Sequence, residues 1–381
     1  MAAEQRSTAD ADDPDGDASL LRPADRGALM LWILVHAGGL IYMMLAGPGR
    51  TTKPFWERLT PWDAENFIAI AQYGYNGPPG MQDAAKLPAF FPGMPLLLRL
   101  FDPFFADLRV ATVVISLVAG AVAVVALSRL SESIRPGSGP WSVAAFLLSP
   151  FSVFLFAGYS EALFLGFALP AWLLARRGRW RLAVLCAAGA SAVRVTGLFL
   201  ALALVVEFAR TRPSARRALR EGPWLLVPFA PVVAYLGYQW ARTGDLMAWK
   251  RAEEVFWGRS AVWPWEALRN TWNRSVETPV LTTSYREEIL AAAVLLGLAL
   301  WLLVRRRWPE FAYIAPQAVA FLTMSSFYMS VGRASLLWWP LWLAIGVTGA
   351  RRPWVYAIIM TFMLPVMAIN VGNFTTGAWV G

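Results

Sequence analysis

The stretch TPWDAENFIAIAQYGY, residues 60–75, places carboxylates and a cluster of aromatic residues in the first polar segment after a long apolar run. A loop just outside a membrane span has no packing reason to hold so many of these side chains unless it folds back onto the membrane surface. Long loops with such a composition are usually functional. We therefore expect this stretch to form half of an active site.

The composition of the 381-residue chain is that of a polytopic membrane protein. Hydrophobic residues make up 57% of it and charged residues only 15%, and the apolar residues occur in long runs. The net charge of +9 comes from short basic clusters between these runs. Membrane topology explains such clusters, so we expect no nucleic-acid partner. The single cysteine, Cys186, and the single histidine, His36, exclude an internal disulfide and a Cys-based metal site.

The apolar runs predict an all-α protein with about eleven transmembrane helices. Residues 1–27 are expected to be a disordered acidic cytoplasmic tail, and residues 28–381 a single membrane-embedded domain. Nine single spans are expected at 28–46, 109–130, 141–158, 160–175, 224–240, 288–304, 310–329, 335–350 and 354–372.

The remaining apolar run, between the basic clusters at 176–181 and 210–220, is too long for one untilted span and short for two. Both flanks are basic and therefore indicate the cytoplasmic side. We expect two short helices that turn at ASAVRVTG, residues 190–197. This hairpin brings the number of spans to eleven, with the N-terminus in the cytoplasm and the C-terminus outside.

The excess of Lys and Arg in the predicted inner loops agrees with the positive-inside rule. Two large outer loops are expected, at 47–108 and 241–287. In this topology Asp63, the turn at 159–161, Arg194 and Arg333 all lie on the outer face of a multi-pass plasma-membrane protein. Polar groups from distant parts of the chain would then meet at one membrane surface, as an active site requires.

Two carboxylates stand out for their positions. Asp63 precedes a helical pattern, so it is either a helix N-cap or a general base. Glu65 would point elsewhere on that helix and is a second candidate only. Glu161 either caps the helix that begins at Ser160 or takes part in catalysis. A carboxylate so close to hydrocarbon needs a cationic partner, and Arg194 is the natural choice.

Several stretches resemble the class V phosphatidylinositol-glycan mannosyltransferases, which add the second mannose of glycosylphosphatidylinositol anchors and have many bacterial members. The resemblance runs in order over most of residues 28–378. It is carried by WDAENFIAIAQYGY, LPAFFPGMPLLLRL, SPFSVFLFAGYSEALF, ASAVRVTG, ARTGDLMAWKRAEEVFWGR and, more weakly, SVGRASLLWWPLW. The chain departs from the family at Asn66, where His is common, and at Ala334, where an aromatic residue is usual.

This resemblance implies a C-type membrane glycosyltransferase fold, with a long first outer loop that carries amphipathic helices. It implies an enzyme that takes a hexose, mannose above all, from a polyprenyl-phosphate donor, with Asp63 as the catalytic base. Glu65, Asn66 and Glu161 are acceptor or acid–base candidates. An arginine fork suits the donor phosphate, so the candidates for it are Arg194 and Arg333, followed by Lys53, Arg242 and Arg259. Candidates for the substrate groove are Trp62, Tyr75, Phe91, Tyr159 and Trp257.

Three matters stay open at this point. Asp63, Glu65 and Asn66 could supply oxygen ligands to a divalent cation, but the sequence has no dense carboxylate cluster, so no metal site is assigned. The acceptor is undetermined: a glycan, a lipid or a protein hydroxyl would all serve. The alternative function is a non-enzymatic transporter or flippase of lipid-linked sugar, which would be expected to show paired internal repeats. No convincing repeat is found.

Overall fold

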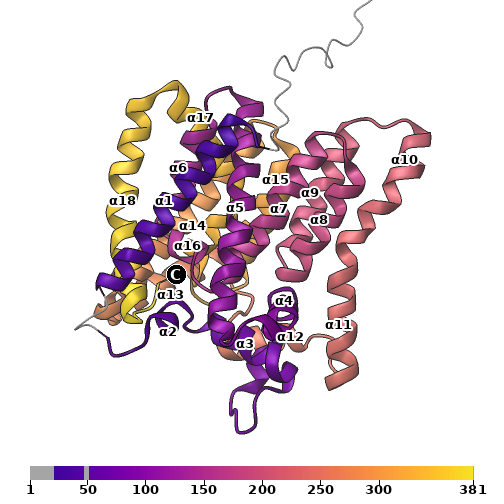
Figure 1. The fold of residues 1–381 in the computed structure, drawn as a ribbon. Coiled ribbons are helices and arrows are strands. Elements are labelled where there is room, and N and C mark those ends of the chain that lie inside the picture. Colours follow the sequence, from indigo (N-terminus) through magenta and orange to yellow (C-terminus); the bar gives the residue numbers. More distant parts are fainter. Residues whose placement is uncertain (1–20, 47–50, 381) are drawn as a thin grey trace, which may run out of the picture.

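The computed structural model describes residues 21–46 and 51–380, and within these ranges the protein is built from helices alone. Four helical segments are long and apolar enough to cross a membrane. They correspond to α1 (Pro23–Ala46), α5 (Leu108–Ile134), α14 (Thr282–Val304) with the turn before it, and α18 (Pro353–Thr376). Figure 1 shows these helices running between the two ends of the molecule. The protein is therefore an all-α membrane protein.

Shorter helices complete the bundle. They are α6 (Gly139–Leu147), α7 (Ser160–Arg176), α8 (Trp180–Val193), α9 (Gly197–Arg210), α10 (Ala215–Glu221), α11 (Ala230–Thr243), α15 (Trp308–Thr323) and α17 (Trp339–Arg351). The loops carry α2 (Phe55–Leu59), α3 (Asp63–Tyr73), α4 (Gly93–Phe101), α12 (Ala248–Trp257), α13 (Pro264–Glu277) and α16 (Val331–Ala334). Seven 3₁₀ turns join these elements: η1 (Gly74–Asn76), η2 (Ala84–Ala89), η3 (Asp102–Phe104), η4 (Ser152–Leu155), η5 (Gly222–Phe229), η6 (Pro279–Leu281) and η7 (Ser335–Leu337).

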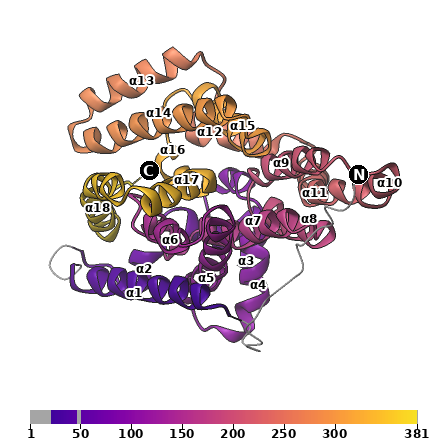
Figure 2. The same cartoon turned by 90° about the horizontal axis from the view of Figure 1, so that it is seen from above.

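Helix α5 lies at the centre of the bundle. Its apolar segment is 61% buried, whereas those of α1 and α18 are 22% buried. Viewed from above, α5 is surrounded by α1, α6, α7 and α17, all of which contact it (Figure 2). A helix that is apolar on every side is satisfied at such a position, because no face of it prefers water.

Small residues let neighbouring helices approach closely, as is common in membrane bundles. A Cβ atom at Gly166 of α7 would lie 2.9 Å from the carbonyl oxygen of Ala119 in α5. A Cβ at Gly346 of α17 would lie 1.9 Å from the hydroxyl oxygen of Ser142 in α6. Any larger residue at either position would push two helices apart.

The predicted hairpin is confirmed. Helix α8 ends at Val193 and α9 begins at Gly197, so the chain turns inside the predicted stretch 190–197. The first helix begins at Pro23 rather than at Ala28, and Asp25 is buried in it, with its carboxylate 2.6 Å from Arg129 of α5. These residues therefore belong to α1 and not to the expected tail, of which residues 1–20 lie outside the described residues.

Several predicted spans differ from the helices observed. The expected span 141–158 is wrong as one helix: α6 stops at Leu147 and η4 follows, because Pro150 cannot donate the next helical hydrogen bond. The expected span 335–350 is likewise divided, since the chain forms η7 and then restarts as α17 with Pro340 in its first turn. The expected spans 224–240 and 310–329 correspond to η5 with α11 and to α15. The total of eleven spans stays a prediction.

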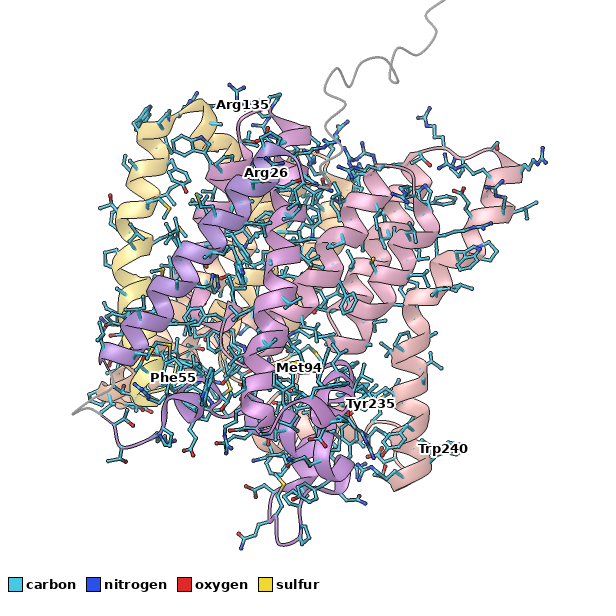
Figure 3. All side chains as sticks on the ribbon, viewed as in Figure 1. Arg26, Phe55, Met94, Arg135, Tyr235 and Trp240 are labelled. Carbon is cyan, nitrogen blue, oxygen red and sulfur yellow. The ribbon has the colours of Figure 1, made fainter. Side chains whose placement is uncertain are left out.

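The two ends of the bundle differ in character. Helices α2, α3, α4 and α12 gather at the lower end in Figure 1. Figure 3 places Arg26 and Arg135 at the opposite end. The long loops 47–108 and 241–287 do contain helices, and α14 already begins at Thr282 within the second. The loop helices surround the lower end of the bundle, where the candidate site lies.

Candidate active site

A cavity of about 520 Å³ lies between the loop helices and the ends of the bundle helices. Segments that are far apart in sequence line it: the start of α3, the end of η2, the turn between α8 and α9, α12, and the turn between α15 and α16. Charged side chains of α3, η2, the α8–α9 turn, α12 and α16 meet here. The expected convergence of polar groups is therefore present as one cavity.

Asp63 is the first residue of α3, one position after the N-cap residue. The N-cap position belongs to Trp62, whose side chain makes no capping hydrogen bond. Instead, Asp63 Oδ2 lies 2.8 Å from a terminal nitrogen of Arg333. The N-cap alternative therefore does not describe this carboxylate, which faces the cavity in an ion pair.

Glu161, in the first turn of α7, is fully buried behind the cavity wall. Its Oε1 lies 2.8 Å from Arg333 Nε and 2.8 Å from a terminal nitrogen of Arg194. The predicted pairing of Glu161 with Arg194 is confirmed, and Arg333, which the sequence suggested only for the donor phosphate, is a second cationic partner. A buried carboxylate requires such partners, because an unpaired charge there is costly.

Arg333 thus connects Asp63 to Glu161. Its guanidinium also lies 5.3 Å from the Phe154 ring and 5.2 Å from the Tyr159 ring, both cation–π distances. The residue before it must be glycine, since a Cβ at Gly332 would lie 2.2 Å from the Phe151 ring. With two carboxylates and two rings around it, Arg333 is held in one place.

Glu288 of α14 fixes the segment that carries Arg333. It is fully buried, and its two carboxylate oxygens accept backbone N–H groups of Ser330, Val331 and Gly332 at 2.9, 2.7 and 3.1 Å. These are the donors at the start of α16, which a helix cannot satisfy itself. The sequence reading missed Glu288, although a carboxylate at the beginning of an apolar run was the same signal that drew attention to Glu161.

Two residues that line the cavity have positive φ without being glycine. These are Trp62, with φ of 53°, and Ser330, with φ of 61°. Each directly precedes the helix that carries one partner of the Asp63–Arg333 pair. Such conformations cost on the order of 1–3 kcal/mol each and collect at functional sites.

The start of α7 is tied to the loop before α3. Gly158 N–H donates to the carbonyl of Leu59 at 2.9 Å, and the Tyr159 hydroxyl donates to the carbonyl of Pro61 at 2.9 Å. The Tyr159–Pro61 bond joins residues that are 98 positions apart in the sequence. It brings the segment that carries Asp63 close to the segment that carries Glu161. The first outer loop is therefore anchored to the bundle.

A carboxylate of α12 also lines the cavity. Glu253 pairs with Arg259 at 2.8 Å, and burial raises the pKa of Glu253 despite that arginine. Trp249 lines the same cavity, as does the predicted groove residue Trp257. Neither Glu253 nor Trp249 was singled out from the sequence. Both lie inside ARTGDLMAWKRAEEVFWGR, one of the stretches that carried the resemblance.

The predicted site residues divide into two groups. Those that line the cavity are Trp62, Asp63, Glu65, Asn66, Phe91, Tyr159, Arg194, Trp257, Arg259 and Arg333. Four others lie outside its wall, and of these Glu161 is buried behind it. Lys53 is exposed, Tyr75 is buried and donates its hydroxyl to the Phe90 carbonyl, and Arg242 bonds to Gln239 and Asn76.

The described residues contain no cluster of side chains that is typical of a metal site. Within residues 21–46 and 51–380, no three His, Cys, Asp or Glu side chains cluster as metal ligands would. Asp63 already faces the Arg333 guanidinium, and the Asn66 amide donates to the Trp62 carbonyl at 3.2 Å. A cation held by Asp63, Glu65 and Asn66 is therefore not assigned.

Residues 49–210 match the sequence profile of the family described as mannosyltransferase (PIG-V). The chain is 35% identical over 152 residues to GPI alpha-1,6-mannosyltransferase 2 of Homo sapiens. Over the same length it is 34% identical to the protein of that name in Mus musculus and 36% identical to the one in Rattus norvegicus.

These matches are partial. The human match covers 37% of this chain and 29% of the relative, so the chain spans less than a third of the length of the curated relatives it matches. No solved structure matches the chain. The similarity thus includes Asp63, Glu161 and Arg194 within the profile match, and leaves Arg333 outside it.

Proposed function

We propose, from the match of residues 49–210 to the PIG-V mannosyltransferase family, that the chain is an inverting glycosyltransferase. It moves a hexose, mannose above all, from a polyprenyl-phosphate carrier to an acceptor hydroxyl. The choice of mannose is supported by the relatives, which are named as mannosyltransferases. The observation that carries the proposal is the ion-pair chain Asp63–Arg333–Glu161–Arg194 at one cavity.

Asp63 is the proposed general base. Its Oδ2 faces Arg333, while its Oδ1 accepts no hydrogen bond from the described part of the chain. One oxygen is therefore fixed and the other is available to a hydroxyl in the cavity. A base must lie within hydrogen-bond reach of the proton it removes, and a carboxylate held at one oxygen meets that need without rotating.

Arg194 is the proposed ligand of the donor phosphate. Only one of its terminal nitrogens is engaged, by Ser160 Oγ and Glu161 Oε1, both at 2.8 Å. Its Nε and other terminal nitrogen form no hydrogen bond or salt bridge with the described residues, which leaves one edge of the guanidinium fork for two phosphate oxygens. Arg333 uses Nε and a terminal nitrogen for the carboxylates, so its proposed role is to hold Asp63.

The proposed reaction is a single displacement. The acceptor oxygen attacks the anomeric carbon and gives its proton to Asp63 Oδ1, while the bond from that carbon to the phosphate oxygen breaks. The electron pair leaves with the polyprenyl phosphate, whose negative charge the Arg194 guanidinium offsets. One carboxylate on the face opposite the leaving group is enough for inversion. The rings of Trp62, Tyr159 and Trp257 would bound the sugar.

We place this reaction on the outer face of the plasma membrane, with the N-terminus in the cytoplasm, because the arginine-rich end of the bundle lies opposite the cavity. The partners are then the lipid-linked donor, the surrounding membrane lipids and an acceptor that bears a free hydroxyl. The acceptor is a glycan, a lipid or a protein.

The decisive experiment compares purified wild-type protein with Asp63→Asn. Both receive polyprenyl-phosphate-mannose and an extract of the source membranes, and mass spectrometry identifies the mannosylated products. Asn keeps the size of the side chain but cannot take a proton, so transfer should fall about 10²- to 10⁴-fold while donor binding persists.

Glu65→Gln is the matched control, because Glu65 lines the same cavity two positions away and forms no salt bridge in the described chain. It should transfer at close to the wild-type rate. Equal transfer by Asp63→Asn and wild type would remove Asp63 from catalysis. Movement of the lipid-linked sugar across vesicles without any product would instead favour a flippase.

A further inference from the structure

A second cavity, of about 620 Å³, lies at the other end of the bundle. It is lined where α5, α14 and α17 end and where α15 and α18 begin. Arg135, which follows the lining residue Ile134, lies at the upper end in Figure 3, while α3 and α12 lie at the lower end in Figure 1. This cavity is therefore separate from the candidate active site.

The mouth of the second cavity is strongly basic. Arg305, Arg307, Arg351 and Arg352 line it, and Glu310 is the one carboxylate among the lining residues. Arg307 Nε pairs with Glu310 Oε1 at 3.1 Å. In the described chain the other three guanidiniums make no salt bridge. The mouth thus carries an excess of positive charge that no carboxylate of the described residues pairs with.

The positive-inside rule explains arginines at this end, but it does not explain a cavity. Below the arginines the walls are apolar, formed by Trp301, Leu302, Leu343 and Val347. The lining extends along α17 from Arg351 to Trp339, a rise of about 18 Å at 1.5 Å per residue. This is close to half the hydrocarbon thickness of a bilayer, about 15 Å. The shape suits an amphiphile with an anionic head and a long apolar tail.

Two lining residues carry buried polar atoms that lack partners among the described residues. Glu310 is 3% exposed, and its Oε2 accepts no hydrogen bond. Trp339 is 1% exposed, and its indole N–H has no acceptor. Buried polar atoms are normally satisfied, so the Glu310 oxygen beside the arginines points to a ligand. A carboxylate oxygen can accept a hydrogen bond from a hydroxyl.

We propose that this second cavity binds one anionic phospholipid with a hydroxyl-bearing headgroup. Its phosphate lies among Arg305, Arg351 and Arg352, a headgroup hydroxyl donates to Glu310 Oε2, and an acyl chain lies along α17 toward Trp339. Basic pockets between helices on the cytoplasmic side are typical sites for such headgroups. The bound lipid joins the α14–α15 pair to the α17–α18 pair. This proposal does not depend on the proposed reaction.

The test uses the full-length protein, purified in detergent and stripped of lipid. Phosphatidylglycerol, phosphatidylcholine or inorganic phosphate is added, and native mass spectrometry counts bound lipid while the melting temperature is recorded. One phosphatidylglycerol should remain bound and raise the melting temperature, and phosphatidylcholine should do neither. Equal binding of both lipids, or equal stabilisation by inorganic phosphate, would overturn the proposal.

The double variant Arg351→Gln/Arg352→Gln should bind phosphatidylglycerol about 30-fold more weakly, since each arginine near an anionic headgroup changes binding roughly fivefold. The matched control is Arg216→Gln/Arg220→Gln in α10, a helix that does not line the cavity. This control should bind phosphatidylglycerol like wild type. An equal loss of binding in both double variants would contradict the proposal, because it would mean that the overall surface charge and not the cavity determines binding.

A third variant covers the case in which the first double variant fails to fold. Ala344→Trp fills the apolar wall and keeps all four arginines at the mouth. It should lose the bound lipid as well. Full retention of phosphatidylglycerol by Ala344→Trp would contradict the assignment of the tail.

Discussion

The family-matched region, residues 49–210, and the region after it, residues 211–380, contribute differently to the candidate active site. The first supplies Asp63, Glu161 and Arg194, and the second supplies Arg333. Both carboxylates of the central network thus come from one region, and the cation between them comes from the other. A profile match that stops at residue 210 therefore contains the proposed base and lacks the residue that holds it.

Each region also contains contacts of its own that position its site residues. Within the first, Glu161 pairs with Arg194 and thereby joins α7 to the α8–α9 turn. Within the second, Glu288 accepts the backbone N–H groups at the start of α16 and sets the position of Arg333. This comparison shows that the site forms where the two regions meet, at the ion pairs of Arg333 with Asp63 and Glu161, which we call the seam. The next three predictions act on that seam.

The largest effect is expected from Arg333→Gln, which removes the cation between Asp63 and Glu161. Breaking a buried ion pair on one side costs about 3–5 kcal/mol, so the unfolding free energy should fall by that order. Transfer should fall by roughly 10²-fold or more, because the base loses its support. Denaturant unfolding in detergent and the mannose-transfer assay measure the two quantities.

Arg242→Gln is the control for this change. Arg242 was a secondary candidate by sequence, and it lies outside the cavity wall and bonds to Gln239 and Asn76. Its loss should leave transfer within about threefold of wild type, the effect of a net hydrogen bond of less than 1 kcal/mol. A similar loss in both variants would mean that Arg333 has no special place at the seam.

A smaller effect is expected from Glu288→Gln. The amide keeps one acceptor oxygen but places an NH₂ group against backbone donors, so the unfolding free energy should drop by about 1.5–3 kcal/mol. Transfer should decline more than donor binding, since Arg333 and Asp63 shift while Arg194 does not. The adjacent Glu287→Gln, which loses one charged partner for Asn370, is the control. Identical behaviour of the two variants would show that the cap does not position Arg333.

The smallest effect is expected from Arg194→Lys. Lysine keeps the charge beside Glu161 but loses the planar fork, so donor affinity should weaken about tenfold or less. Arg333→Lys should instead lower turnover with donor affinity nearly kept. Titration with polyprenyl-phosphate-mannose and turnover at saturation separate the two. The reverse pattern would exchange the roles proposed for the two arginines.

The residues of the site could be predicted where the chemistry is local. The turn at 190–197 followed from Arg194, Thr196 and Gly197 interrupting an apolar run, and the structure has it there. Glu161 was expected to need a cation because the membrane leaves a carboxylate no alternative. Glu288 and Glu253 were not predicted from the sequence. Glu288 binds backbone N–H groups and Glu253 binds Arg259, and the positions of these partners depend on the fold.

By itself the sequence determined that this is a helical membrane protein, which end of it is basic, and which polar residues interrupt its apolar runs. These follow from hydropathy and charge, which act on each segment independently. Only the tertiary structure decided where the apolar runs break into α6 and η4, and which guanidinium faces Asp63. Breaks and pairings of this kind depend on the packing of distant segments. Arg333 reaches Asp63 because Gly332 packs against Phe151 and because Glu288 holds the turn before Arg333. Both contacts join residues that are far apart in the sequence, so the residues next to Arg333 do not predict them.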